Sequence, residues 1–367
     1  MDLQLLTAKP WKAVRVDGSP TKSKGLYWIT RIKHKAAIVL TKHFGFNYGL
    51  AEVAIGRCTF SLLKEALKHS ADLYIAHNLA ALPVAVLAAK KNNTKCGFDA
   101  EDFHRNEVSN DPKDIDVKLK TYIEEEYFSQ VDYLTASSFP IAQLYQKLFP
   151  AKKITTVLNA FSVVKEVSLS VTKPNEPLKL FWFSQTIGLN RGLQDVFSAL
   201  NFLKNEFIEL HILGFLNEKT TCSLNELVVE PQLQKKIKIV FHQPINPDQL
   251  PIFAAQFDVG LALEPNYPLN RNICLTNKIF TYLQAGLAVL ASDTEAQKQF
   301  ITENPNVGFC YEKGNAQQMA VILKQLIDQP ELLLQTKHTA YQAARSNLNW
   351  ETESQKFLKV VKETLAS

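Results

Sequence analysis

The chain of 367 residues is 46% hydrophobic and 21% charged, the composition of an ordinary globular protein with room for two domains. It has no apolar run of about 18 residues, which excludes a membrane-spanning helix by composition, and its first residues lack the apolar core of a signal peptide. The five cysteines are far apart and form no Cys-x-x-Cys pair, which argues against a zinc site or a disulfide framework.

The net charge of +5 is concentrated at the start of the chain. Residues 1–70 hold twelve Lys and Arg against four Asp and Glu, whereas the remainder is slightly acidic. A basic surface of this kind suits an anionic membrane or a phosphate-bearing acceptor, and a merely solvated basic face is the alternative. We therefore expect a cytoplasmic protein in peripheral contact with the inner face of the membrane through residues 1–70. No nucleic-acid recognition motif accompanies the basic residues, so we expect no nucleic-acid partner.

In the first half of the chain, apolar runs of strand length alternate with patterns typical of helices. The predicted strands are Leu3–Ala8, Ala13–Val16 at an edge, Leu73–Ala76, Lys95–Asp99, Asp132–Ala136 and Lys153–Leu158. The predicted helices are Phe60–His69, Ala81–Lys91, Lys118–Phe128 and Pro140–Leu148, preceded by mixed helical signals over residues 25–45. Alternation at this spacing predicts a parallel sheet covered on both faces.

Residues 162–177 have no helical period and contain two prolines, which predicts a linker before a second pattern of the same kind. The strands predicted there are Leu178–Phe183, Glu209–Leu213, Lys236–Phe241, Phe257–Leu263 and Leu287–Ser292. The predicted helices are Gly192–Leu203, one opened by Asn246-Pro247-Asp248, one from Thr276 or Asn277 to Gly286, residues 316–328, residues 331–346 and Trp350–Leu365.

Together the two patterns predict an α/β protein with two Rossmann-like, doubly wound domains facing each other across a cleft. Ligands are expected at the carboxyl ends of the strands. We place an N-terminal acceptor-side domain at residues 1–165, a linker at 166–177 and a C-terminal nucleotide-sugar-binding domain at 178–347. Residues 348–367 are expected to form a terminal helix that packs back toward the N-terminal domain.

The stretch Arg271–Gly286 joins two of the predicted buried strands through a polar loop and a helix. The start of such a helix presents unpaired N–H groups and the positive end of the helix dipole, so it favours an anion. Lys278 lies in the first turn, where a cation is unfavourable for the helix itself. A bound phosphate would compensate for that cost, and a solvated surface lysine is the alternative.

Several segments resemble the large retaining, nucleotide-sugar-dependent family of GT-B glycosyltransferases (glycosyl transferases group 1, family 4-like). The C-terminal segments are Asn277–Asp293 (NKIFTYLQAGLAVLASD), Phe183–Leu193 (FSQTIGLNRGL), Leu210–Gly214 and Phe257–Glu264. The N-terminal segments are Ala71–Asn78 (ADLYIAHN), Val131–Ser138 (VDYLTASS) and Val157–Phe161. The resemblance covers nearly the whole chain, and its specificity comes from the order and spacing of these segments taken together.

The resemblance implies a donor site in the C-terminal domain and an acceptor site in the N-terminal domain. Donor contacts are expected from Arg191 and Lys278 to the phosphates, from backbone amides near Gly188, Gly192, Thr276 and Asn277, and from Glu264 and Thr281 to hydroxyl groups. Glu101 and His104 are expected to face the donor sugar as catalytic residues, with His77, Asn78 and Asp102 on the acceptor side. The sequence has no Asp-x-Asp motif, and the family is expected to use protein cations at the leaving diphosphate, so we expect neither a metal nor a cofactor.

The chain also departs from the family pattern. Thr281 stands where the family has its second donor-site glutamate, Ile273 stands where it has the partner of that glutamate, and Gln185 replaces an arginine. No Gly-rich loop precedes Leu3–Ala8, which looks like the family's second strand, so the N-terminal domain is expected to lack the first strand and helix or to have an unusual first unit.

The resulting hypothesis is a retaining, metal-independent glycosyltransferase. Its donor would be a UDP- or GDP-sugar, and its acceptor a hydroxyl of a growing polysaccharide or a lipid-linked glycan. The departures favour a first alternative, a catalytically degenerate GT-B protein that binds nucleotide sugars or acts as a scaffold. A nucleotide-sugar epimerase of the same architecture is a second alternative, and DNA binding by residues 1–70 alone is a third.

Overall fold

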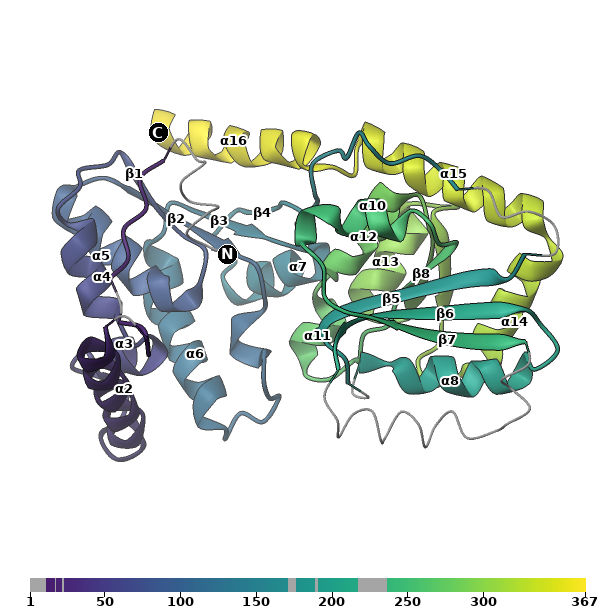
Figure 1. Cartoon of the computed structure of the whole chain (residues 1–367). Coiled ribbons are helices and arrows are strands. Elements are labelled where there is room, and N and C mark those ends of the chain that lie inside the picture. Colours follow the sequence, from purple (N-terminus) through teal and green to yellow (C-terminus); the bar gives the residue numbers. More distant parts are fainter. Residues whose placement is uncertain (1–10, 17, 22, 171–175, 189–190, 217–235) are drawn as a thin grey trace.

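The computed structural model describes residues 11–16, 18–21, 23–170, 176–188, 191–216 and 236–367. The described chain forms two α/β halves side by side, each built on one parallel sheet (Figure 1). Two Rossmann-like halves are the predicted fold class, and this prediction is confirmed. The predicted strand Leu3–Ala8 lies outside the described residues. In the described part of the chain, no helix combines the length and the apolar character needed to cross a membrane.

The N-terminal half contains a four-stranded parallel sheet of order β1-β2-β3-β4. Its strands are β1 (Leu73–Ala76), β2 (Lys95–Ala100), β3 (Tyr133–Ala136) and β4 (Ile154–Thr156). Its helices are α2 (Lys24–Phe44), α3 (Leu50–Ile55), α4 (Thr59–Ala66), α5 (Leu82–Asn92), α6 (Ile115–Tyr127) and α7 (Phe139–Leu148). A single core under the sheet contains the fully buried rings of Phe98, Phe128 and Tyr145.

The predicted edge strand Ala13–Val16 is wrong, because these residues form no strand in the structure. Val14 is 45% exposed, so this segment packs no apolar face against the sheet. The helical signals of residues 25–45, in contrast, form one continuous helix, α2.

The C-terminal half contains a six-stranded parallel sheet of order β10-β9-β8-β5-β6-β7. Its strands are β5 (Leu178–Thr186), β6 (Ile208–Phe215), β7 (Ile237–His242), β8 (Val259–Ala262), β9 (Ala288–Ser292) and β10 (Gly308–Tyr311). Its helices are α8 (Leu193–Phe202), α10 (Leu250–Ala254), α11 (Leu269–Ile273), α12 (Asn277–Ala285), α13 (Glu295–Glu303), α14 (Ala316–Asp328) and α15 (Pro330–Ser346). Separate cores lie on the two faces of the sheet, as expected for central strands that are apolar throughout.

The last helix, α16 (Trp350–Ala366), runs from the C-terminal half across to the N-terminal sheet (Figure 1). The ring of Phe357 lies 6.3 Å from that of Tyr133 in β3. The buried carboxylate of Glu353 accepts a hydrogen bond of 2.9 Å from the amide of Leu158. This helix therefore ties the two halves together on the side where the chain passes from one to the other.

A second connection between the halves is made by α11. The side-chain oxygen of Asn270 accepts a hydrogen bond from the Phe103 amide at 2.7 Å, and its nitrogen donates to Asp102 at 2.7 Å. The Ser138 hydroxyl donates to the carbonyl of Ile273 at 2.6 Å, and the Ile273 side chain is part of the N-terminal core. The loop before α12 is thus anchored in the opposite half, which fixes the distance across the space between them.

Candidate functional site

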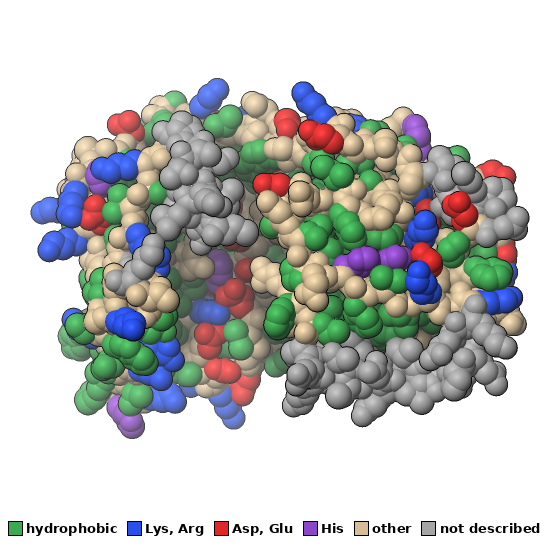
Figure 2. Space-filling view, viewed as in Figure 1, with side chains coloured by type: hydrophobic (Ala, Val, Ile, Leu, Met, Phe, Trp, Pro, Cys, Tyr) green, Lys and Arg blue, Asp and Glu red, His purple; other side chains and the backbone are tan. Residues whose placement is uncertain are grey.

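A cavity of about 1140 Å³ lies between the two halves. Figure 2 shows the hollow there, with acidic side chains along its N-terminal side. The C-terminal half contributes residues at or just after the carboxyl ends of β5, β6, β7 and β8, including Phe183, Leu213, Pro244 and Glu264. The N-terminal half contributes Asp102, Glu107 and Lys120 among others. The cavity therefore occupies the edge at which parallel sheets bind ligands.

Lys278 lies at the start of α12 and lines this cavity. Its side chain is only 9% exposed, and its ammonium group donates a hydrogen bond to the carboxylate of Glu264. The alternative of a solvated surface lysine is therefore wrong. The hydroxyl of Thr276, the residue before the helix, does not cap α12, because it donates to Glu264 at 3.1 Å instead. The first turn of α12 thus faces the cavity without a side-chain cap.

Glu264 is the centre of a charged cluster with Lys278, Arg271 and Thr276. The Arg271 guanidinium lies 3.3 Å from one Glu264 oxygen, and Lys278 and Thr276 contact the other. Burial alone favours the neutral carboxyl, but the nearby Lys278 ammonium, and after it Arg271 and the Thr276 hydroxyl, outweigh burial and lower the pKa of Glu264. Glu264 is therefore ionised at neutral pH, and the two cations around it leave an excess of positive charge.

Arg191 lines the same cavity as Lys278, so the structure brings together the two cations that the sequence singled out. Gly192 follows it at the opening of α8, with a φ of +81°. A Cβ built at Gly192 would lie 2.6 Å from the Cβ of Leu263, so the tight approach of this turn to β8 requires glycine. At Gly188 a Cβ would meet nothing within 4 Å, which leaves open space beside that backbone.

Thr281, which stands at the family's glutamate position, is buried and lines the cavity together with Asn277. Its hydroxyl lies 3.5 Å from the Asn277 carbonyl, one turn earlier in α12. Ile273, the other departure, packs in the N-terminal core and is fully buried. The glutamate positions of the family are thus occupied here by a short hydroxyl and by an apolar anchor between the halves.

One wall of the cavity is apolar, and no motif in the sequence predicted it. Its residues are Phe183, Leu213, Pro244, Ile245 and Leu250. They come from the ends of β5 and β6 and from the turn that leads into α10. The apolar wall and the cations lie in one cavity, an arrangement that suits a ligand with a flat apolar part and an anionic part.

On the N-terminal side, the structure does not bring Glu101 or His104 to the cavity lining, where Asp102 and Glu107 lie instead. The side chain of His104 is only 4% exposed, and its ring packs on Phe98. Its Nδ1 lies 3.5 Å from Glu107, which also pairs with Lys120 at 2.8 Å. Burial opposes the charge on Glu107, but hydrogen bonds from His104 and Lys120 prevail and lower its pKa to about 2.

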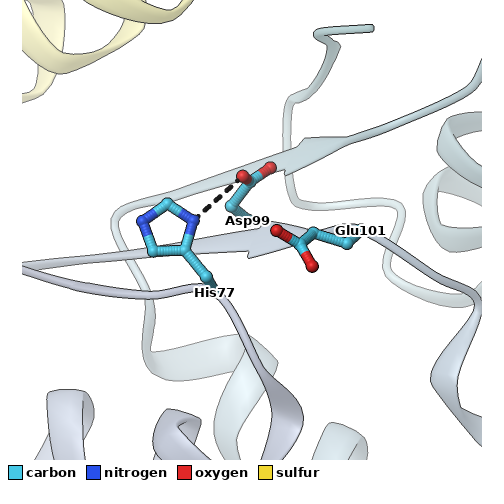
Figure 3. A group of neighbouring side chains, drawn as sticks. All are labelled: His77, Asp99 and Glu101. Carbon is cyan, nitrogen blue, oxygen red and sulfur yellow. Dashed lines mark hydrogen bonds and ion pairs between the residues drawn. The ribbon is translucent and has the colours of Figure 1, made fainter. Parts of the chain in front are cut away.

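Glu101 belongs to a separate cluster with His77 and Asp99, at the carboxyl ends of β1 and β2 (Figure 3). Nδ1 of His77 lies 3.1 Å from one Asp99 oxygen, and the Thr135 hydroxyl donates to the other at 2.6 Å. The hydrogen bond to Asp99 raises the pKa of His77. One ligand atom from each of His77, Asp99 and Glu101 lies within 4.8 Å of the others, a spacing at which three side chains could hold a metal ion.

Asn78, the remaining residue predicted on the acceptor side, has a local structural role. Its side-chain oxygen accepts a hydrogen bond of 2.9 Å from the Ala80 amide and so caps the 3-10 helix η1 (Leu79–Ala81). The structure thus divides the predicted acceptor-side residues. Asp102 lines the cavity, His77 lies in the neighbouring cluster, and Asn78 holds the turn after β1.

Two doubly wound halves with a shared cavity at the carboxyl ends of their strands define the GT-B fold of glycosyltransferases. Sucrose-phosphate synthase from Thermosynechococcus elongatus is similar with a TM-score of 0.67 and 13% identity, over 86% of this chain and 79% of its own. HepE from Anabaena, solved in complex with UDP, gives a TM-score of 0.62 and 14% identity, over 84% and 83%.

A glycosyltransferase from Rickettsia africae is similar over 99% of this chain and 87% of its own, with a TM-score of 0.65 and 16% identity. No protein-family model and no curated protein sequence matches this chain. Identities this low establish a common fold, whereas activity depends on the residues of the site.

Proposed function

We propose that this protein is a glycosyltransferase that moves a sugar from a nucleoside diphosphate donor to an acceptor hydroxyl. The observation that carries the proposal is the convergence of Arg191, Arg271 and Lys278 with the start of α12 on one cavity. A leaving diphosphate develops negative charge, and fixed cations with backbone amides stabilise it. Charge-assisted hydrogen bonds to phosphate are among the strongest that a protein makes. The UDP complex of HepE, which has the same fold, supports a nucleotide as the ligand.

The donor would lie with its phosphates at Lys278 and Arg191 and with its base along the apolar wall of Phe183, Leu213 and Ile245. A UDP- or GDP-sugar is the proposed donor class. Glu264 and Thr281 line the same cavity and would accept hydrogen bonds from ribose or sugar hydroxyls. The protein cations take the place that a metal ion has in other transferases, so the proposed transfer is metal-independent. The resemblance to the retaining family supports retention of configuration at the transferred sugar.

The acceptor would approach from the N-terminal half. Asp102 and Glu107 are the carboxylates of that half in the cavity lining, and both are held in place, Asp102 by Asn270 and Glu107 by Lys120. Carboxylates accept hydrogen bonds from sugar hydroxyls, so a growing polysaccharide or a lipid-linked glycan is the proposed acceptor.

The binding part of the proposal is tested by calorimetric titration and thermal shift with UDP-glucose, GDP-mannose, ADP-glucose and UDP. A specific ligand raises the melting temperature as its concentration increases. At a ligand concentration a hundred times the Kd, the unfolding free energy increases by about 2.7 kcal/mol. Arg191→Ala should weaken UDP binding more than uridine binding, because only UDP carries the phosphates. Lys298→Ala, an exposed lysine on α13, is the matched control and should change neither. If none of these nucleotides shows saturable binding, the proposal is refuted.

The transfer itself is tested by incubating a bound nucleotide sugar with glycan acceptors in the presence and absence of EDTA. The proposal expects product with the donor's anomeric configuration in both, as determined by NMR. A second candidate function is nucleotide-sugar binding without turnover, which is favoured by Thr281 at the donor-site position and by the placement of Glu101 and His104 off the cavity lining. Saturable binding without product across an acceptor panel would support this second function.

A further inference from the structure

Helix α2 presents its apolar side away from the protein. The side of α2 that faces the domain carries its buried residues Thr30, Ala37 and Thr41, which are 6%, 3% and 4% exposed. The opposite side carries Trp28, Ile32 and Val39, which are 55%, 64% and 54% exposed. These three residues are four and seven positions apart, so they form one stripe along the helix. A helix that only covered a protein core would show the reverse pattern, with the apolar stripe inside and the small polar residues outside.

The contacts of α2 with the rest of the N-terminal half are correspondingly local. Its principal neighbour is α3, and Nδ1 of His34 lies 2.9 Å from the carbonyl oxygen of Val53 in that helix. Leu26, Ile29, Leu40 and Phe44 are also exposed, and by helical geometry they extend the apolar surface around one flank of this stripe.

The charge on this helix is entirely positive. Residues 24–44 contain Lys24, Arg31, Lys33, Lys35 and Lys42 and no aspartate or glutamate. By helical geometry, Lys35 and Lys42 border the apolar stripe on one side. Lys33 lies on the other side, at the far edge of the flank that carries Leu26 and Leu40, and all three lysines are exposed. Figure 2 shows hydrophobic and basic side chains gathered over α2 at the lower left of the molecule, with no acidic side chain among them in this view.

We propose that α2 lies flat in the interface of an anionic lipid bilayer, with Trp28, Ile32 and Val39 among the acyl chains. Lys33, Lys35 and Lys42 would contact the lipid phosphates on either side. An apolar stripe bordered by lysines with a tryptophan is the pattern of an interfacial helix. A second copy of this chain is disfavoured as the occupant of this face, because pairing would set two sets of five positive side chains against each other.

The position of α2 makes this contact compatible with the cavity. In Figure 1 the helix lies at the outer end of the N-terminal half, away from the C-terminal half. Membrane contact through α2 would therefore hold the proposed acceptor-side half at the lipid surface and leave the C-terminal half open to solution. The inference of lipid contact is drawn from the exposed residues of α2 alone and does not depend on the proposed glycosyl transfer.

The test is co-sedimentation of the full-length protein with vesicles of phosphatidylcholine alone and of phosphatidylcholine with about a third phosphatidylglycerol. We expect binding to the anionic vesicles only, weakened by added salt because exposed charges are screened. The double variant Ile32→Ser/Val39→Ser should reduce the partition coefficient at least about tenfold, because it removes the inserted apolar groups. Both residues are exposed, so the variant should keep the wild-type melting temperature.

The matched control is Ile252→Ser/Val321→Ser, the same two changes at exposed positions of α10 and α14 in the other half. It should bind anionic vesicles as the wild type does. Absence of binding to anionic vesicles, or equal loss in both double variants, would overturn the proposal. So would a concentration-dependent dimer in sedimentation velocity that Ile32→Ser/Val39→Ser abolishes without any lipid binding. Nucleotide titration without vesicles reports on the cavity separately, so the two proposals fail independently.

Discussion

Removal of the Lys278 ammonium is expected to weaken nucleoside diphosphate binding strongly. A charge-assisted hydrogen bond is worth about 1.5–3 kcal/mol, which corresponds to a Kd for UDP about 10- to 150-fold higher. The same change also leaves Glu264 in a buried place with one cation fewer. Breaking a buried ion pair costs about 3–5 kcal/mol, and Arg271 at 3.3 Å and Thr276 at 3.1 Å offset part of that cost here. Lys278→Met is therefore expected to lose both affinity and stability.

The two effects are separated by the double variant Lys278→Met/Glu264→Gln, in which no unpaired charge stays buried. We expect its unfolding free energy, from urea titration, to recover most of the loss. The UDP affinity, from calorimetry, should remain low because the cation is still missing. Uridine, which has no phosphate, should lose less affinity than UDP in the double variant, because only UDP loses the contact with the Lys278 cation. If the folded double variant binds UDP within about twofold of the wild type, Lys278 does not hold the phosphates.

Three further outcomes follow from the geometry. Asn270→Ala breaks both hydrogen bonds of the Asn270 side chain to the N-terminal half and leaves the buried Phe103 amide unpaired. We therefore expect the unfolding free energy to fall by about 1–3 kcal/mol in urea titration. An unchanged urea midpoint would contradict this expectation. Gly192→Ala is expected to lower the melting temperature by several degrees, because the added Cβ meets Leu263 at 2.6 Å and φ is +81°, whereas Gly188→Ala, with open space, should change it little. The folded-state pKa of Glu107 is depressed to about 2 from 4.5, so its stabilisation is present above pH 4.5 and lost as the pH falls toward 2. The stability gap between wild type and Glu107→Gln should shrink over that range, and a constant gap would contradict the pairing with Lys120.

The alternation of apolar runs with helical segments was sufficient to predict the fold. Central strands of a parallel sheet are buried on both faces, so β8 and β9 read as continuous apolar runs, and each is buried throughout. Gly286 was predicted to end a helix, and it does so in the left-handed conformation at the end of α12. The pattern missed β10, because four residues with a mixed burial pattern carry no clear period, and it also missed α13 before it.

The site was only partly accessible from the sequence. Lys278 was identifiable because a cation in the first turn of a helix conflicts with the local dipole. Its carboxylate partner, Glu264, is fourteen residues earlier, just after β8, so the ion pair depends on how the loop after β8 meets the start of α12. The sequence also could not show which residues after β2 line the cavity, because residues one to three positions apart there have different surroundings. There the 3-10 turn η2 (His104–Asn106) carries His104 inward and leaves Glu107 at the cavity.

The sequence by itself determined the two parallel sheets, the helix that begins at Asn277 with a lysine in its first turn, and the basic character of the first seventy residues. These properties are local, because they depend on periodicity, on helix ends and on the count of charges. Tertiary structure decided which carboxylates line the cavity, which face of α2 is exposed, and that Asn270 joins the halves. Each of these depends on contacts between residues far apart in the chain, and the hydrogen bonds that fix them exist only once both halves are folded and docked.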